Sequence, residues 1–402
     1  MFKFIMEWVD ARLPVSDLIK SQATEYPTPK NLNYWWNFGS LALFVLIIQL
    51  ATGLFLAMHY KPDALKAFDS VEHIMRDVNW GWLLRYLHAN GATAFFVMIY
   101  IHMLRGMYYG SHRKPREILW WFGVIIFFVL MATAFMGYVL PWGQMSYWGA
   151  SVITNLVSAV PVAGEDLVVW VWGGFSVGDP TLNRFFVLHF LLPFAVLGLV
   201  VLHLWALHAV HSNNPDGIDL EHKDTIPFHP YFTIKDLYGV GVFLIVFCIF
   251  VFYSPNFFLE PDNYIEANPM QTPPHIVPEW YFLPFYAILR SIDFLGSFSK
   301  LAGVIAMGGA IAILFLLPFL DRSPARSFRY RPISRVLFWI FVVDNFILGW
   351  VGYNPADATV LGGMPIVYVG RAGTAVYFSY FLLLWFITVT GIEKPRPLPK
   401  SL

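Results

Sequence analysis

Long apolar runs recur along the chain and alternate with polar or mixed stretches. Each is long enough to cross a bilayer as a helix, because about 20 predominantly apolar residues span the hydrocarbon core. The eight runs are 36–58, 82–104, 118–140, 184–207, 236–254, 299–319, 333–351 and 373–391. The pattern predicts an all-α integral membrane protein with eight transmembrane helices in a lipid bilayer.

Basic residues indicate how these helices are oriented. An even number of spans places both termini on one side, and Lys and Arg gather in the loops and tail of that same side. They are Arg105, Arg113, Lys114, Arg116, Lys223, Lys235, Arg322, Arg326, Arg329, Arg331, Arg335, Lys394, Arg396 and Lys400. The positive-inside rule then makes both termini cytoplasmic. The arginine-rich inner loops favour a bacterial plasma membrane over the alternative, a mitochondrial inner membrane.

The two longest outer loops, 141–183 and 255–298, are rich in Pro, Gly, Trp and acidic residues. Loops of this length are usually functional or disordered, and the aromatic content argues against disorder. We expect them to form short surface helices over the outer ends of the membrane helices. The predicted organisation is a cytoplasmic or interfacial N-terminal segment (1–35), a four-helix bundle (36–235) and a C-terminal membrane region of four helices (236–402).

Composition excludes several classes of function. Hydrophobic residues make up 57% of the 402 and charged residues 13%, far from the quarter that is typical of soluble domains. The formal net charge is zero, so nothing indicates a nucleic-acid partner. A single cysteine, Cys248, excludes an internal disulfide, a Cys-x-x-Cys-His haem attachment and a cysteine-only iron–sulfur cluster. Any haem must be held without covalent attachment, and histidine is the obvious ligand.

Histidines occur in pairs within two of the predicted spans. They are His88 and His102 in the second span, and His189 and His203 in the fourth. Each pair is separated by fourteen residues, which is about 40° short of four helical turns and about 21 Å along the axis. Two parallel helices with this spacing can hold two haems, one above the other. His88 and His189 would ligate an outer haem, and His102 and His203 an inner one. A lone intramembrane histidine could equally be a core residue, but matched pairs favour ligands.

Glycines repeat the same spacing in the neighbouring spans. Gly39 and Gly53 are fourteen residues apart, as are Gly123 and Gly137. One such pair would indicate close helix packing, but two matching pairs favour clearance for a haem edge. Two arginines lie near the histidines, Arg85 on the outer side and Arg105 on the inner side. Either could pair with haem propionates, although Arg105 is equally suited to anchoring at the inner membrane surface.

The chain resembles cytochrome b of the cytochrome bc1 family over nearly its whole length. The resemblance rests on Asn37–Gly39, Thr52–Tyr60, Gly137–Met145 and, above all, the tetrapeptide Pro278-Glu279-Trp280-Tyr281 in the second outer loop. Family resemblance implies two non-covalent b-type haems and quinol and quinone as substrates. It further implies a Rieske iron–sulfur protein and cytochrome c1 as partners, and a homodimer of the complex.

The resemblance implies an outer site at which quinol is oxidised. Its residues would be Tyr138, Met145, Gly149, Pro278, Glu279 and Tyr281. Chemically, Glu279 is a carboxylate among aromatic residues at a membrane boundary, where burial can tune it to accept a quinol proton near neutral pH. Without the tetrapeptide, a solvated loop carboxylate would be the simpler interpretation.

An inner site at which quinone is reduced is also implied, at the cytoplasmic ends of the fourth and fifth spans. Its residues would be His208, Ser212, Asn213, Lys235 and Asp236. A histidine and a carboxylate on either side of a quinone can hydrogen-bond its carbonyls and supply protons, although a helix-end charge pair beside a surface histidine is the plainer alternative. One residue departs from the family pattern: His211 stands where a glycine is expected.

Together these residues predict a catalytic subunit of a proton-translocating quinol–cytochrome c reductase in a respiratory chain. Two alternatives remain open at this point. A di-haem membrane anchor with one quinone site would lack the Pro278–Tyr281 motif. A transporter that relays protons through intramembrane histidines would bind no haem, and an optical spectrum would separate it from the others.

Overall fold

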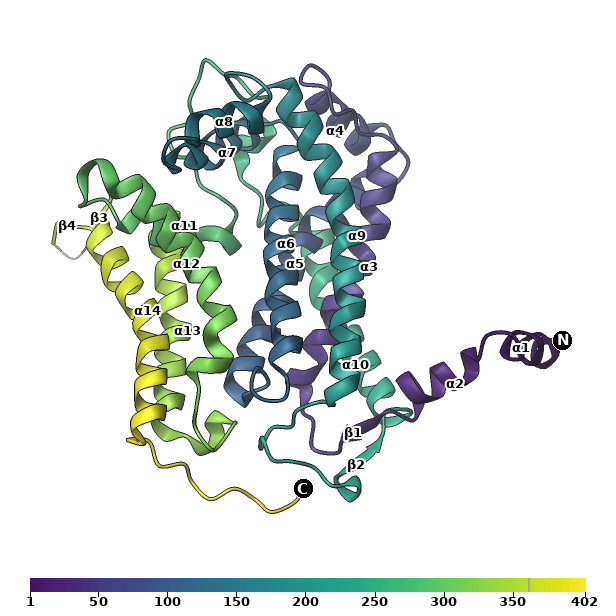
Figure 1. Cartoon of the computed structure of the whole chain (residues 1–402). Coiled ribbons are helices and arrows are strands. Elements are labelled where there is room, and N and C mark those ends of the chain that lie inside the picture. The colour runs from purple at the N-terminus through teal and green to yellow at the C-terminus, as the bar shows by residue number, and fades with distance from the viewer. Residues whose placement is uncertain (361) are drawn as a thin grey trace.

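Eight long helices dominate the computed structural model, which describes residues 1–360 and 362–402. They are α3 (Asn37–Ala57), α5 (Gly81–Tyr109), α6 (Glu117–Val139), α9 (Asp179–Val210), α10 (Tyr231–Tyr253), α12 (Ser299–Leu320), α13 (Pro332–Tyr353) and α14 (Ile366–Thr390). All eight are long and apolar enough to cross a membrane, and each coincides with one of the predicted spans. They run side by side (Figure 1). The predicted all-α fold with eight membrane helices is confirmed.

Shorter elements cover the two ends of this assembly. The short helices are α1 (Phe2–Asp10), α2 (Val15–Ile19), α4 (Ala67–Arg76), α7 (Gln144–Asn155), α8 (Gly164–Trp172) and α11 (Leu283–Ser291). The strands are β1 (Pro27–Pro29), β2 (Thr225–Pro227), β3 (Thr359–Val360) and β4 (Met364–Pro365). Helices α4, α7 and α8 gather at the outer end of the bundle (Figure 1), and α7, α8 and α11 are the surface helices predicted for the long outer loops.

Helix ends follow local sequence signals. Helix α5 ends at Tyr109, and the next residue, Gly110, has a positive φ of 72°, which suits a residue without a side chain. Helix α9 begins at Asp179, and Pro180 in its first turn sets the helical φ where no backbone donor is needed. The polar stretches between the apolar runs therefore interrupt the helices where the sequence pattern indicates.

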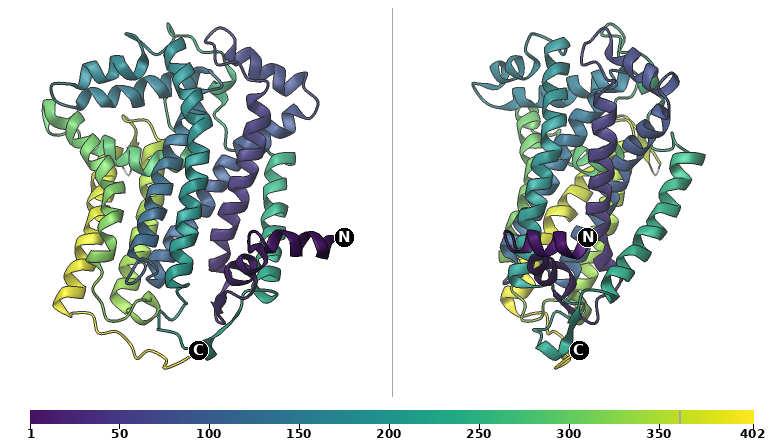
Figure 2. Two further views of the ribbon diagram at one scale, coloured as in Figure 1. Left: turned by 45° about the vertical axis from the view of Figure 1, so that its right-hand side comes forward. Right: turned by 90° about the vertical axis from the view of Figure 1, so that its right-hand side faces the viewer.

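Packing separates the long helices into two groups. Helix α3 packs along α5 and α6 along α9, while α11 and α14 pack against each other and against both α12 and α13. Helix α10 packs against α3 and α5, although the predicted division at residue 235 assigned it to the C-terminal region. Figure 2 shows α10 tilting away from the bundle toward its outer end. The division itself stays a prediction, but α10 lies against the N-terminal group.

At the inner end, distant parts of the chain are joined. Strand β1 pairs antiparallel with β2, with Pro27 opposite Pro227. In the C-terminal group, the Arg331 side chain is fully buried and lies 2.7 Å from an Asp321 oxygen and 3.1 Å from a Glu393 oxygen. A guanidinium with two carboxylates is a buried ion cluster that ties the segment after α14 to the loop between α12 and α13.

Candidate functional site

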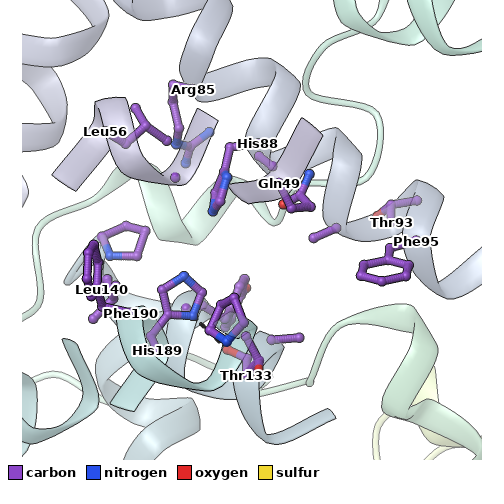
Figure 3. Close-up of a pocket in the computed structure, with 18 of the residues that line it drawn as sticks. Gln49, Leu56, Arg85, His88, Thr93, Phe95, Thr133, Leu140, His189 and Phe190 are labelled. Carbon is purple, nitrogen blue, oxygen red and sulfur yellow. Dashed lines mark hydrogen bonds between the residues drawn. The ribbon is translucent and has the colours of Figure 1, made fainter. Parts of the chain in front are cut away.

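The outer pair of predicted haem ligands meets across the bundle. His88 on α5 and His189 on α9 face each other with ring centroids 6.1 Å apart. Both line a cavity of about 240 Å³, into which their rings project from opposite sides (Figure 3). Besides the imidazoles, the lining is mostly apolar, and its other polar or charged residues include Gln49, Thr93, Thr133, Arg85, Glu260 and Glu279.

Hydrogen bonds fix which nitrogen of each outer histidine is free. The Thr52 hydroxyl donates to the Ile48 carbonyl at 2.7 Å and so accepts from Nδ1 of His88 at 2.9 Å. Nδ1 of His189 donates to the carbonyl of Thr133 at 2.8 Å. A proton on Nδ1 leaves the Nε2 lone pair available to a metal, which is the arrangement that second-shell partners create for ligating histidines.

The inner pair has a similar ring separation but a different orientation, with ring planes at 58° instead of the 85° of the outer pair. His102 on α5 and His203 on α9 have ring centroids 6.2 Å apart. Two imidazole–metal bonds of about 2.0 Å each, with about 1.1 Å from each nitrogen to its ring centre, place two rings on one metal about 6.2 Å apart. Both pairs therefore fit one iron between two imidazoles. The assignment of the four histidines as ligands stays a prediction that this geometry supports.

The four predicted glycines face the four histidines one to one. A β-carbon added at Gly137 would lie 2.4 Å from Cε1 of His189, and one at Gly53 would lie 3.0 Å from Cε1 of His88. The corresponding distances are 3.0 Å from Gly39 to His102 and 3.4 Å from Gly123 to His203. Each glycine thus leaves room for the edge of an imidazole ring. Sequence reasoning assigned the space to a haem edge, and the histidine ring is the nearer occupant.

The two predicted arginines present positive charge beside the histidines. Arg85 lines the cavity at its rim, and its buried Nη1 has no partner among the described residues. Arg105 lies over the Trp36 ring at 4.9 Å and places Nη2 3.2 Å from Nδ1 of His102. Its buried Nε has no partner in the described part of the chain. Buried guanidinium donors of this kind suit the carboxylates of a haem.

Among the residues that the structure describes, no group of three or more His, Cys, Asp and Glu side chains could hold a metal ion. Paired histidines, buried arginine donors and glycines beside the rings form an arrangement that fits a non-covalent haem, whose iron histidine side chains can hold.

Predicted residues of the outer quinol site gather beside the outer histidine pair. Tyr138, Gly149, Pro278 and Glu279 line a small pocket of about 30 Å³, and Tyr138 and Glu279 also line the larger cavity. The Glu279 side chain is 8% exposed, and its Oε1 has no partner among the described residues. Burial, with the nearby Glu260 carboxylate, raises the pKa of Glu279 to about 8. A carboxyl group with this pKa can accept and release a proton near neutral pH.

Two other predicted residues lie apart from the small pocket. Met145 is buried in α7 at 2% exposure and does not line either cavity. Tyr281 lines only the larger cavity, where its ring stacks on Phe96 with centroids 3.8 Å apart. Met145 can therefore act on the small pocket only through packing, whereas Tyr281 forms part of the wall of the larger cavity that Glu279 also lines.

Sequence reasoning missed the residues of α5 that hold the Pro278–Tyr281 segment. Tyr100 donates a 2.6 Å hydrogen bond to the Tyr281 carbonyl, and Trp280 donates its indole N–H to the Thr93 hydroxyl at 3.3 Å. Thr93, Phe96 and Tyr100 follow the i, i+3, i+7 spacing of one helix face, which is the signal that could have identified them. Tyr286, which also lines the small pocket, has no local sequence signal.

Predicted residues of the inner site contact the N-terminal segment. His208 donates from Nδ1 to Oε1 of Gln22 at 2.7 Å and stacks on Tyr26 with centroids 4.3 Å apart. Lys235 donates to the Leu32 carbonyl. Residues 22–32 therefore lie along both His208, near the end of α9, and Lys235, at the start of α10. No feature of the sequence indicated that contact.

The other three inner residues are placed as follows. The Ser212 hydroxyl donates to the Asn213 carbonyl at 3.0 Å. Asn213 is 3% exposed and donates to the Tyr109 carbonyl at 2.8 Å, so its amide nitrogen ties the loop after α9 to the end of α5. Asp236 is half-buried in the first turns of α10, next to Lys235.

Comparison with known proteins gives the class to which this site belongs. Residues 23–211 match the family described as Cytochrome b/b6/petB, and residues 266–378 match Cytochrome b(C-terminal)/b6/petD. The chain is 58% identical to cytochrome b of Rhodospirillum rubrum, with 99% of this chain and 95% of that protein covered. It is equally 58% identical to cytochrome b of Rickettsia prowazekii, covering 99% and 97%.

A solved structure described as a hyperthermophilic respiratory Complex III contains a similar chain. The TM-score is 0.88 at 39% sequence identity, with 96% of this chain and 99% of that chain covered. This chain belongs to the cytochrome b/b6 family. It is an integral, multi-pass membrane protein, and membership of the family implies b-type haem cofactors and a role in electron transfer.

Proposed function

We propose that this chain is the quinone-binding, haem-carrying subunit of a proton-translocating quinol–cytochrome c oxidoreductase. The observation that carries the proposal is that the histidines face each other in two pairs, with ring centroids 6.1 Å apart in the outer pair and 6.2 Å apart in the inner pair. The buried carboxyl group of Glu279 lines the same cavity as the outer pair. His88 with His189 would hold an outer b-type haem, and His102 with His203 an inner one. These haems supply one-electron transfer across the bundle when they are bound.

The residues of the outer site act on quinol and its protons. Tyr138, Gly149 and Pro278 bound the small pocket and exclude water from it, while Glu279 reaches from that pocket into the larger cavity. Oxidation of a quinol releases two electrons and two protons. Glu279 accepts a proton on its unpartnered Oε1 and passes it to the outer aqueous side. Tyr281 adds an aromatic wall to the larger cavity beside Glu279, and Met145 supports the pocket by packing.

The residues of the inner site act on quinone. His208 and Asp236 supply protons to a quinone that takes up electrons at the cytoplasmic ends of α9 and α10. Lys235 provides positive charge there, and Ser212 and Asn213 shape the loop after α9. Moving charge across a membrane against its potential costs about 2.3 kcal/mol per 100 mV for each elementary charge, so separated quinone sites convert redox energy into a proton gradient.

Partners are required because the chain has only one cysteine and no means of holding an iron–sulfur cluster by cysteines alone. We propose a Rieske iron–sulfur protein and cytochrome c1 as partners, in a homodimeric complex. Two comparisons support this: the structure described as a respiratory Complex III, and a 56% identical Bradyrhizobium diazoefficiens protein named cytochrome b/c1, of which this chain covers 56%. The basic inner loops support a bacterial plasma membrane with cytoplasmic termini.

A redox-titrated visible spectrum of the purified complex tests the haem assignment. We expect two b-type components in the wild type, the outer one missing in His189→Ala and the inner one missing in His203→Ala. Loss of the same component in both variants would refute the stacked arrangement. No haem at all would favour the transporter instead. Retention of full quinol oxidation by Glu279→Gln would refute the role of Glu279 as proton acceptor.

A further inference from the structure

The end of α9 has an unusual backbone. His211 follows the last helical residue with φ 58° and ψ 163°, a conformation that is ordinarily open only to glycine. Non-glycine residues with positive φ in the described chain are Trp80, Trp142, Val162 and His211. Of these, only His211 adjoins the predicted inner site. A strained non-glycine residue persists only where its surroundings hold it in place.

Arg116 holds this backbone. It is 9% exposed, and it donates from Nε to the His211 carbonyl at 2.8 Å and from Nη2 to the Val210 carbonyl at 3.4 Å. The free carbonyls at the end of a helix carry partial negative charge, which a cation stabilises. Burial lowers the pKa of Arg116 to about 10, so the guanidinium stays charged at neutral pH. The strained carbonyl is thus fixed by a buried cation.

The His211 ring joins a group of three rings. Its centroid lies 5.7 Å from that of Tyr26, and Tyr26 in turn stacks on His208 at 4.3 Å. Tyr26 is 8% exposed, its Oη has no partner among the described residues, and burial raises its pKa to about 12. We refer to His208, Tyr26 and His211 as the ring group. It connects a predicted quinone-site residue to an exposed imidazole.

Stability does not explain a histidine at this position, and the packing of its ring is limited to the tilted contact with Tyr26. The His211 side chain is exposed and makes no hydrogen bond within the part of the chain that the structure describes. Glycine would end the helix in the same conformation without strain, and Arg116 would still bind the backbone carbonyl. The feature that only histidine adds is an imidazole between the aqueous side and Tyr26.

We propose that His211 is a second imidazole of the inner quinone site and carries protons from the cytoplasmic water to the ring group. This inference rests on the proposed function. Reduction of one quinone takes two electrons and two protons and gives one quinol. The electrons arrive one at a time. Each is the second electron released by a quinol at the outer site, so two quinols must be oxidised there for one quinone to be reduced. The protons come from water through His211 and His208. The charged or titratable groups that face His211 are His208 on α9, Tyr26 on the N-terminal segment and Arg116 before α6.

His211→Gly removes the imidazole and the strain together, so it needs a matched control. Val162→Gly relieves a positive φ of 68° in an exposed loop outside both quinone sites. Both variants would be prepared in the whole complex with Glu279→Gln to slow the outer site. The measurement is the rate at which a short-chain benzoquinone reoxidises the pre-reduced b-type haems. His208→Ala serves as the reference for the inner site.

We expect both glycine variants to raise the apparent melting temperature, and only His211→Gly to slow quinone reduction, by about tenfold or more. Free imidazole in the buffer should restore much of the lost rate in His211→Gly and have no effect on Val162→Gly. An unchanged rate in His211→Gly, with a loss in His208→Ala, would overturn the inference alone. A loss that imidazole does not restore would also overturn it. If His208→Ala itself has no effect, the inner site proposed above is wrong.

Discussion

The contact between Gly137 and His189 leads to a sharp prediction. A β-carbon at Gly137 would lie 2.4 Å from Cε1 and 2.8 Å from Nδ1 of His189, whereas carbon atoms in contact are normally about 3.5–4.0 Å apart. In Gly137→Ala the ring must therefore retreat by about 1.1 Å or more. Ligand distances in a metal site tolerate only about 0.2 Å. We expect Gly137→Ala to lose the outer b-type haem.

The same substitution elsewhere provides the control. At Gly123 the added β-carbon would lie 3.4 Å from Cε1 of His203, which is close to an ordinary contact. Gly123→Ala should keep the inner haem with little change. Gly39 and Gly53, at 3.0 Å from His102 and His88, should give intermediate effects. The severity of the four substitutions therefore follows the four distances.

Displacing His189 also affects its other contact. A retreat of about 1.1 Å stretches the 2.8 Å hydrogen bond from Nδ1 to the Thr133 carbonyl beyond hydrogen-bonding range. Losing it costs about 0.5–1.5 kcal/mol in addition to the steric strain. Redox difference spectra of the four alanine variants, with haem content per mole of protein, test the order. Full occupancy of both haems in Gly137→Ala would refute the reasoning.

Three further predictions concern other contacts. Burial raises the pKa of Glu279 to about 8, so the carboxylate that accepts a proton becomes more abundant as pH rises. Quinol oxidation should therefore increase up to about pH 8 and then level off. Glu279→Gln should slow the reaction and flatten this pH profile. Tyr100→Phe removes the 2.6 Å bond to the Tyr281 carbonyl, and should cost about 1 kcal/mol and slow quinol oxidation without changing haem spectra; an unchanged rate would exclude a positioning role. Arg331→Met leaves Glu393 buried without a cation and Asp321 with only the more distant Arg113 at 3.9 Å, and should destabilise the protein by about 3–5 kcal/mol, measured as a lower unfolding midpoint. An equally stable variant would show that the cluster does not hold the C-terminal segment.

Apolar runs and matched spacings were sufficient to predict the membrane helices and the facing side chains. The distance of fourteen residues between His88 and His102 fixes one face of one helix, because helical geometry is local. The same spacing in α9 then brings His189 and His203 opposite them. Gly53 and Gly137 indicated the same faces of the neighbouring helices. The sequence indicated that each glycine leaves space, but it did not indicate which group fills that space. The occupant depends on how α3 and α6 are rotated against α5 and α9.

The contacts that were missed are long-range and involve ordinary residues. Gln22 and Tyr26 lie in a mixed polar segment without periodicity, and their contact with His208 requires residues about 180 positions away to fold back. Met145 shows the opposite case. Its motif predicted a residue in the quinol pocket, but the face of α7 on which it lies packs into the core. Side-chain direction in a short surface helix is set by what lies beneath it, which local sequence does not encode.

The pairing of β1 with β2 has a consequence for biogenesis. Pro27 pairs with Pro227, which is synthesised 200 residues later, after four membrane helices. At about 5–20 residues per second, the ribosome needs about 10–40 s to deliver the partner strand. Throughout that interval β1 has no strand to pair with. A nascent chain that has not yet reached β2, in the loop after α9, therefore cannot form the β1–β2 pair at the inner end of the bundle. Intermediates that already contain the first four membrane helices therefore still lack this closure of the inner end.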